Sequence, residues 1–123
     1  FRALAAARPA INLGTFVTAG SVRRYVLGDA DRAATPAEIE RMRELVDAAM
    51  RQGALGLSAG LIYAPASFAG TDELVALAEV AARHGGGYAT HLRSEGDRLL
   101  EAIAEAIAIG ERAGTWVQIH HLK

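Results

Sequence analysis

Histidines stand at the ends of two short apolar segments of this chain. His91 lies near the end of segment 88–92, and His120 and His121 close segment 115–121. Neutral imidazole is the commonest metal ligand in proteins, and a metal held there would polarise a carbonyl and lower the pKa of water. A lone histidine at a strand end is more often a hydrogen-bonded structural residue. The metal chemistry therefore depends on the two segments converging.

Alternation of side chains along a strand sorts these residues into faces. It places His121 and Lys123 on one face and turns His120 to the other. It also places His91 and Arg93 on a common face, provided that the strand stays regular there. The sequence thus predicts one polar pocket at the ends of neighbouring strands, with His120 packing outside it.

Several of the charged residues also have structural explanations. Arg93 and Glu95 suit a surface ion pair, which contributes little to stability. His84 precedes Gly85 at a predicted helix end, where a cation complements the helix dipole. Lys123 suits a solvated position. These readings stay open beside the functional ones.

A rival motif surrounds Ser58. Residues 56–60 read Gly-Leu-Ser-Ala-Gly and fit the G-x-S-x-G pattern of a serine nucleophile at a strand-to-helix turn. The pattern is weak here because residues 63–67, Tyr-Ala-Pro-Ala-Ser, are typical of a loop rather than a helix.

The elements that must position these residues alternate in type. Short, nearly all-apolar runs predict buried parallel strands, and amphipathic stretches long enough for parallel crossovers separate them. Thr35-Pro36-Ala37-Glu38 predicts a capping box at one helix start, and Thr71 is expected to cap the next helix. Residues 20–28 suggest a single helical turn. The predicted strands span residues 11–17, 54–58, 88–92 and 115–121.

This order predicts an α/β fold with a parallel sheet. Four strands suit either a small doubly wound domain or about half of a (β/α)8 barrel. Because both ends of the chain look cut from something longer, we expect residues 1–123 to be an internal segment of a barrel domain.

Composition excludes some classes of function. The 123 residues are 51% hydrophobic and 22% charged, with a net charge of −1 and no cysteine. The charge balance removes the usual electrostatic reason for a nucleic-acid or anionic-membrane partner. No apolar stretch is long enough to span a membrane, and no signal peptide is visible. We therefore expect a cytoplasmic protein.

Four blocks of the sequence together resemble the N-acyl-D-amino-acid deacylases (D-aminoacylases) of the metal-dependent amidohydrolase superfamily. The blocks are residues 20–28, 53–65, 88–95 and 117–123, in the order found in that family. The resemblance implies a (β/α)8 barrel with a smaller β-domain. It also implies zinc, or a similar divalent metal, and hydrolysis of small N-acyl-D-amino acids to a carboxylate and a D-amino acid.

The resemblance also implies roles for individual residues. His121 matches the metal-ligand histidine of a Ser-His-x-Lys block. Lys123, His91, Arg93 and Tyr63 are expected to bind substrate, with Arg93 suited to a carboxylate through a bidentate bond.

Much of the family's site is absent from these residues. His120 occupies the position where Ser is common. The family's His-x-His strand, bridging cysteine, further metal histidine and catalytic aspartate would all lie outside. We therefore expect no catalytic residue within the 123 residues and no activity from the isolated chain, because a catalytic zinc needs about three protein ligands.

Two alternatives remain. The scaffold could serve a related cyclic-amide or dipeptide hydrolase. The chain could also be a non-catalytic structural fragment. In either case half a barrel would expose sheet edges and apolar surface, and so self-associate.

Overall fold

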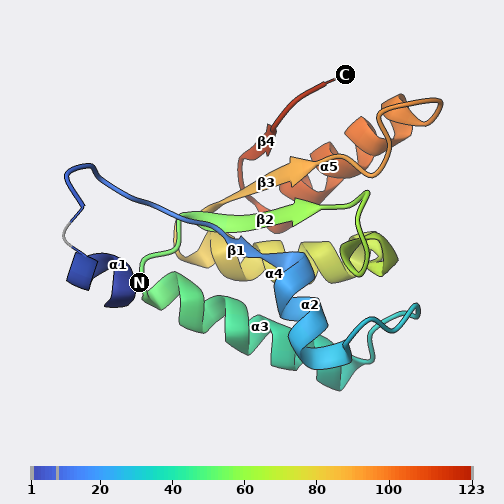
Figure 1. The fold of residues 1–123 in the computed structure, drawn as a ribbon. Coiled ribbons are helices and arrows are strands. Elements are labelled where there is room, and N and C mark those ends of the chain that lie inside the picture. Colours follow the sequence, from blue (N-terminus) through green and yellow to red (C-terminus); the bar gives the residue numbers. More distant parts are fainter. Residues whose placement is uncertain (1, 8, 123) are drawn as a thin grey trace.

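A computed structural model describes residues 2–7 and 9–122 of the chain (Figure 1). Helices and strands alternate along most of its length, as the sequence predicted. In chain order the elements are α1 (Arg2–Ala7), β1 (Val17–Thr18), α2 (Ala19–Leu27), α3 (Pro36–Arg51), β2 (Gly56–Gly60), the short 3-10 helix η1 (Ala66–Phe68), α4 (Thr71–Arg83), β3 (Gly87–His91), α5 (Leu99–Ala113) and β4 (Val117–Ile119).

The four strands form one parallel sheet in the order β1-β2-β3-β4. Leu57 of β2 pairs with Val17 of β1 and with Tyr88 of β3, and Tyr88 pairs in turn with Val117 of β4. Each strand therefore lies beside the next one in sequence, with helices between them in the chain. The prediction of an α/β fold with a parallel sheet is confirmed.

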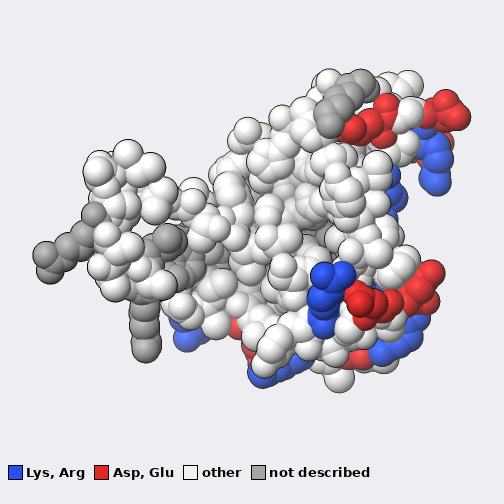
Figure 2. Space-filling view, viewed as in Figure 1, with Lys and Arg blue, Asp and Glu red and all other residues white. Residues whose placement is uncertain are grey.

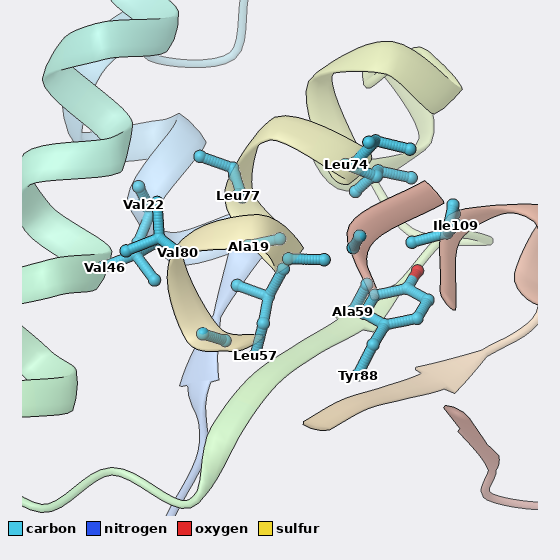
Figure 3. Packing of buried hydrophobic residues seen from close by; sticks show 14 of the residues in the cluster. Ala19, Val22, Val46, Leu57, Ala59, Leu74, Leu77, Val80, Tyr88 and Ile109 are labelled. Carbon is cyan, nitrogen blue, oxygen red and sulfur yellow. The ribbon is translucent and has the colours of Figure 1, made fainter. Parts of the chain in front are cut away.

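The core lies between the sheet and the helices that cover one of its faces (Figure 3). Leu57 of β2 and Tyr88 of β3 project into this layer, which Leu77 and Val80 of α4 also fill, and all four side chains are fully buried. Burying a side chain of this size stabilises a fold by about 1.5–3 kcal/mol. Because α4 packs under both central strands, it fixes where their carboxyl ends lie.

The first predicted strand is much shorter than expected. Residues 11–16 lie outside β1, and Ile11 and Leu13 are 68% and 51% exposed. A single backbone hydrogen bond, from the Leu55 amide to the Thr15 carbonyl oxygen at 2.9 Å, precedes the ladder, and regular pairing with β2 covers only Val17 and Thr18. The expectation of one helical turn in residues 20–28 was also too short, since α2 occupies nearly all of that range.

Helix α3 starts as predicted. The Thr35 hydroxyl accepts a hydrogen bond from the Glu38 amide at 3.3 Å, and the Glu38 carboxylate accepts one from the Thr35 amide at 2.8 Å. Helix α4 starts differently, because Gly70 rather than Thr71 is its cap. The Thr71 hydroxyl instead donates to Glu105 of α5 at 2.8 Å.

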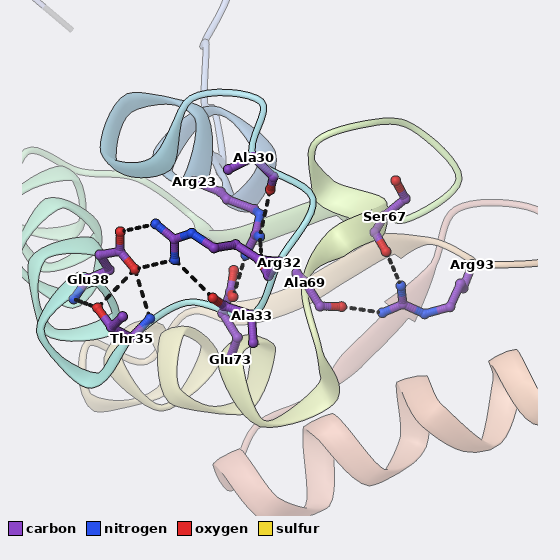
Figure 4. Close-up of polar contacts among 10 residues, drawn as sticks. All are labelled: Arg23, Ala30, Arg32, Ala33, Thr35, Glu38, Ser67, Ala69, Glu73 and Arg93. Carbon is purple, nitrogen blue, oxygen red and sulfur yellow. Dashed lines mark hydrogen bonds and ion pairs between the residues drawn. The ribbon is translucent and has the colours of Figure 1, made fainter.

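A buried ion pair ties α2 to α4 (Figure 4). Arg23 donates to the Glu73 carboxylate and also to the carbonyl oxygens of Ala30 and Arg32. The two side chains are only 1% and 6% exposed. The pair fastens the connection between α2 and α3 onto α4.

Strands β2 and β3 each begin with a glycine, Gly56 and Gly87. A Cβ atom on Gly56 would lie 2.3 Å from the carbonyl oxygen of Gly87. A Cβ atom on Gly87 would overlap the ring of Trp116, at 2.1 Å from its nearest atom. Only glycine fits at these two positions, so backbone and ring approach one another closely at this end of the sheet.

Charged side chains are unevenly spread over the face shown in Figure 2. Most of the visible charge lies on the side toward which β2 and β3 point, and the middle of the face is uncharged. In residues 2–7 and 9–122 there is no helix with the length and apolar character that crossing a membrane requires.

Candidate metal centre at the strand ends

Two histidines and a carboxylate meet at the carboxyl edge of the sheet. His91 is the last residue of β3, Glu95 lies in the connection between β3 and α5, and His121 follows β4. The ligand atoms of all three side chains lie within 4.8 Å of one another. Parallel neighbours end at the same edge, which is why residues far apart in sequence converge here.

The contact between Glu95 and His121 fits a shared cation. The His121 Nδ1 and Glu95 Oε1 atoms are 2.6 Å apart and buried, yet neither has a hydrogen-bond partner of acceptable geometry among the described residues. Buried polar atoms are almost always satisfied. Imidazole nitrogen and carboxylate oxygen are both zinc ligands, so a divalent metal would satisfy the two atoms together.

His91 is oriented to join them. Its Nδ1 atom donates to the backbone carbonyl oxygen of Leu92 at 3.2 Å, because a carbonyl can only accept. With Nδ1 protonated, Nε2 is left as the acceptor nitrogen that binds a metal. The rings of His91 and His121 lie edge to face with centroids 4.4 Å apart.

Because β4 ends at Ile119, His121 rather than His120 lies beside His91. Thr90 pairs with Ile119, and the His120 amide donates to the Thr90 carbonyl oxygen at 3.0 Å. Regular pairing beyond this point would set His120 beside His91. The strand instead ends at Ile119, His120 is exposed, and His121 turns in toward His91.

Tyr63 reaches the same place from the neighbouring strand. It follows β2, and its ring centroid lies 5.5 Å from that of His91. The side chain is 64% exposed, so one face of the ring is open. A hydrogen bond of 3.1 Å from the Leu61 amide to the His91 carbonyl oxygen joins the two strand ends. The structure therefore brings Tyr63, His91 and His121 together.

Arg93 takes a different direction from His91, because β3 ends before it. Its Nε and Nη2 atoms donate to the Glu105 carboxylate at 2.8 and 2.9 Å. Its Nη1 and Nη2 atoms donate to the carbonyl oxygens of Ser67 and Ala69, both at 2.8 Å (Figure 4). A role in substrate binding stays a prediction for Arg93. Lys123, the other predicted cation, lies outside the described residues.

The Arg93–Glu105 pair shifts the pKa of both groups. The hydrogen bond to Glu105 raises the pKa of the Arg93 guanidinium above its ordinary value. Burial acts to raise the pKa of Glu105, but hydrogen bonds from Arg93 and Thr71 outweigh it and hold that pKa below its ordinary value. Both groups are therefore charged at neutral pH.

A cleft of about 450 Å³ lies beside this pair rather than beside the histidines. Arg93, Arg98, Glu101 and Glu105 are among the residues that line it. Its charged groups are paired with one another, through Arg93–Glu105 and Arg98–Glu101. Among the described residues, those that line the cleft carry none of the buried, unsatisfied polar atoms found at the candidate metal centre.

Ser58 does not stand at a nucleophile elbow. It lies inside β2, and the strand leads into a loop and η1 rather than directly into a long helix. Its Oγ atom is 3.4 Å from the Thr18 hydroxyl on the adjacent strand. Within the described part of the chain, no histidine is paired with it, so the serine-hydrolase reading is not supported.

Glu95 is the site residue that the sequence did not single out. It read as the surface partner of Arg93, but Arg93 bonds to Glu105 instead. Its place in the first loop after a strand that ends in histidine was the available signal. His84, by contrast, has the structural place expected of it, at the end of α4 and 2.8 Å from Asp47 of α3. The hydrogen bond from His84 lowers the pKa of Asp47.

Parallel βα units with two imidazoles and a carboxylate at the carboxyl ends of the strands have the residue types and the location of a metal site in an α/β barrel. Comparisons with known proteins agree. The chain is 40% identical over 121 residues to D-aminoacylase of Alcaligenes xylosoxydans xylosoxydans, covering 98% of this chain and 25% of that protein. It is 42% identical over 123 residues to the N-acyl-D-aspartate deacylase of the same organism, covering 99% of this chain and 25% of the relative.

Solved structures give the same result. The crystal structure of D-aminoacylase, described as defining a novel subset of amidohydrolases, matches with a TM-score of 0.92 at 40% identity, over 96% of this chain and 25% of that one. N-acyl-D-glutamate deacylase from Bordetella bronchiseptica, solved with zinc and a phosphonate mimic of the tetrahedral intermediate, matches with a TM-score of 0.90 at 38% identity, over 95% and 25%. No family model matches the chain.

These matches confirm the resemblance to N-acyl-D-amino-acid deacylases and the prediction of a barrel fragment. The chain spans about a quarter of the length of the relatives that it matches.

Proposed function

We propose that residues 1–123 are an internal segment of a metal-dependent amidohydrolase barrel domain. The complete protein then hydrolyses the amide bond of N-acyl-D-amino acids, releasing a carboxylate and a D-amino acid. The convergence of His91, Glu95 and His121 at the strand ends carries this proposal. Identities of 36–42% to three deacylases over nearly the whole chain support it.

His121, His91 and Glu95 are the residues that would hold zinc or a similar divalent metal. The sequence assigned His91 to the substrate, but its place beside His121 favours a ligand role. A bound metal supplies the Lewis acid that polarises the scissile carbonyl and lowers the pKa of water. A catalytic zinc with an open position takes about three protein ligands, and the catalytic acid–base group is assigned to the rest of the protein.

Tyr63 borders this centre on the side of β2. Its exposed ring lies beside His91, and the ring face and the hydroxyl suit contact with the acyl or amino-acid part of a substrate. Lys123 would add a cation for the substrate carboxylate. A small N-acyl amino acid is the partner in this proposal. The expectations of no nucleic-acid or membrane partner, of self-association by the isolated chain and of a cytoplasmic location stay predictions.

The test is an assay of the complete gene product with N-acetyl-D- and N-acetyl-L-amino acids, together with metal analysis. Zinc-dependent release of D-amino acids would support the proposal. If the protein cleaves only cyclic amides or dipeptides, the proposed substrate class is wrong, while the proposed metal centre still stands. A purified protein that hydrolyses amides without any divalent metal would overturn the proposal.

A further inference from the structure

The loop that carries Tyr63 is held from outside the candidate metal centre. We define the Tyr63 loop as residues 61–70, between β2 and α4. The Ser67 amide donates to the Tyr63 carbonyl oxygen at 2.9 Å, and the Ser67 carbonyl oxygen accepts from Arg93 at 2.8 Å. Arg93 also binds the carbonyl oxygen of Ala69. One guanidinium thus fixes the loop at two backbone positions.

Glu105 fixes the guanidinium in turn. Its carboxylate accepts two hydrogen bonds from Arg93 and one from the Thr71 hydroxyl at the start of α4. The network therefore joins the end of β3, the Tyr63 loop, α4 and α5. Arg93 and Glu105 are both half-buried or better, so water competes only weakly for their bonds.

We propose that Arg93 and Glu105 form a positioning pair that holds the Tyr63 loop so that the Tyr63 ring lies against His91. This inference rests on the proposed function for its effect on catalysis. A loop with an exposed aromatic side chain loses conformational entropy when it is fixed. The backbone bonds from Arg93 offset that cost before substrate arrives.

The same geometry argues against direct substrate binding by Arg93. A guanidinium has five N–H donors, and bonds to Glu105, Ser67 and Ala69 use four of them. The edge that would grip a substrate carboxylate through two bonds already grips Glu105. Arg93 therefore acts through the loop.

The experiment compares Arg93→Lys and Glu105→Gln with wild type in the complete protein. Arg112→Ala is the matched control, because Arg112 also joins α5 to α4, through Asp72, without contacting the Tyr63 loop. Hydrogen exchange of residues 61–70, zinc content, and kcat and KM for the N-acyl-D-amino acid are measured. We expect faster exchange in the loop for both variants, unchanged zinc content, and kcat/KM lower by about 10- to 100-fold, as small misplacements near a site can produce. Arg112→Ala should match wild type.

Tyr63→Ala decides whether the effect passes through the loop. If it does, adding Tyr63→Ala to either variant lowers kcat/KM by much less than Tyr63→Ala lowers it in wild type. If Arg93 instead binds substrate itself, Glu105→Gln weakens the bonds that compete for the guanidinium and leaves kcat/KM unchanged or higher. That result, or wild-type exchange rates in both variants, would overturn the inference.

The exchange measurement keeps the inference separate from the proposed function. A wild-type protein without deacylase activity would refute the proposed function, while the loop exchange would still decide the positioning pair. Should Arg93→Lys not fold, Glu105→Gln alone carries the test, because glutamine preserves the size of the side chain and one acceptor for Arg93.

Discussion

The rings of His91 and His121 meet edge to face, at 88° and with centroids 4.4 Å apart, although His91 ends β3 and His121 follows β4. Each ring has a distinct second contact. His91 donates to the backbone at Leu92, and His121 faces the carboxylate of Glu95. Contacts within the protein therefore orient both rings, and side chains that are held by such contacts lose less conformational entropy when they bind a metal.

Replacing His121 with alanine should remove zinc from the complete protein. The variant loses one of the imidazoles and leaves Glu95 without its partner. We expect metal affinity to fall by more than about 100-fold, because loss of outer-shell partners alone weakens metal sites by about 10- to 100-fold. Competition with a zinc-binding dye measures the affinity. His120→Ala is the control, since His120 is the exposed neighbour of His121 and is not one of the three candidate ligands, and it should retain zinc.

Replacing Glu95 with glutamine should weaken metal binding without unfolding the protein. Glutamine keeps the shape of the side chain but removes the charge that faces His121. We expect affinity to fall by about 10- to 100-fold. Cobalt substitution offers a second measurement, because the visible spectrum of bound cobalt reports its ligands. Glu101→Gln, on an exposed residue paired with Arg98, should change neither. An unaltered metal affinity in Glu95→Gln would show that Glu95 is not a ligand of the metal.

Replacing Glu73 with glutamine should be among the most destabilising changes in the chain. It leaves the buried Arg23 guanidinium without a counter-ion, at a cost of about 3–5 kcal/mol in the free energy of unfolding. Chemical denaturation of the complete protein measures this loss. The double variant Arg23→Met with Glu73→Leu removes both charges and should recover most of it. If the double variant were less stable than Glu73→Gln, the ion pair itself would be the source of stability.

Acid should weaken the link between α4 and α5 through Glu105. The pKa of Glu105 in the folded protein lies below its ordinary value of 4.5, despite the opposing effect of burial. A lowered pKa means that the stabilisation is complete above the ordinary pKa and is lost as the pH falls through the folded value. Arg93, Thr71 and the nearby charge of Arg98 are its partners. As the pH falls below 4.5 and through the lower pKa of the folded protein, Glu105→Gln should therefore lose less stability than wild type, as measured by denaturation at each pH.

Much of this arrangement could be predicted because it follows from local patterns. The capping box at Thr35 and Glu38 needs only residues that are adjacent on one helix turn. The order of parallel strands follows from apolar runs separated by helices. Given that order, His91 and His121 had to end at the same edge of the sheet.

The rest depends on where regular structure stops, which the sequence pattern does not specify. Alternation beyond His91 would have kept Arg93 in the same pocket, but β3 ends there and Arg93 turns to Glu105. The contact between Glu95 and His121 joins two irregular segments, so no periodicity could reveal it. Residues 11–16 are a further example, because their apolar pattern predicted a strand but regular pairing with β2 begins only at Val17.

The glycines at the opposite end of the sheet make the metal centre sensitive to distant substitutions. Alanine at Gly87 would push against Trp116, and Trp116 leads directly into β4. A displaced β4 would carry His121 away from its partner on β3, although the altered residue touches none of the candidate ligands. If variants from random mutagenesis are screened for bound zinc, those that have lost zinc should therefore include substitutions at Gly87 as well as at the two histidines.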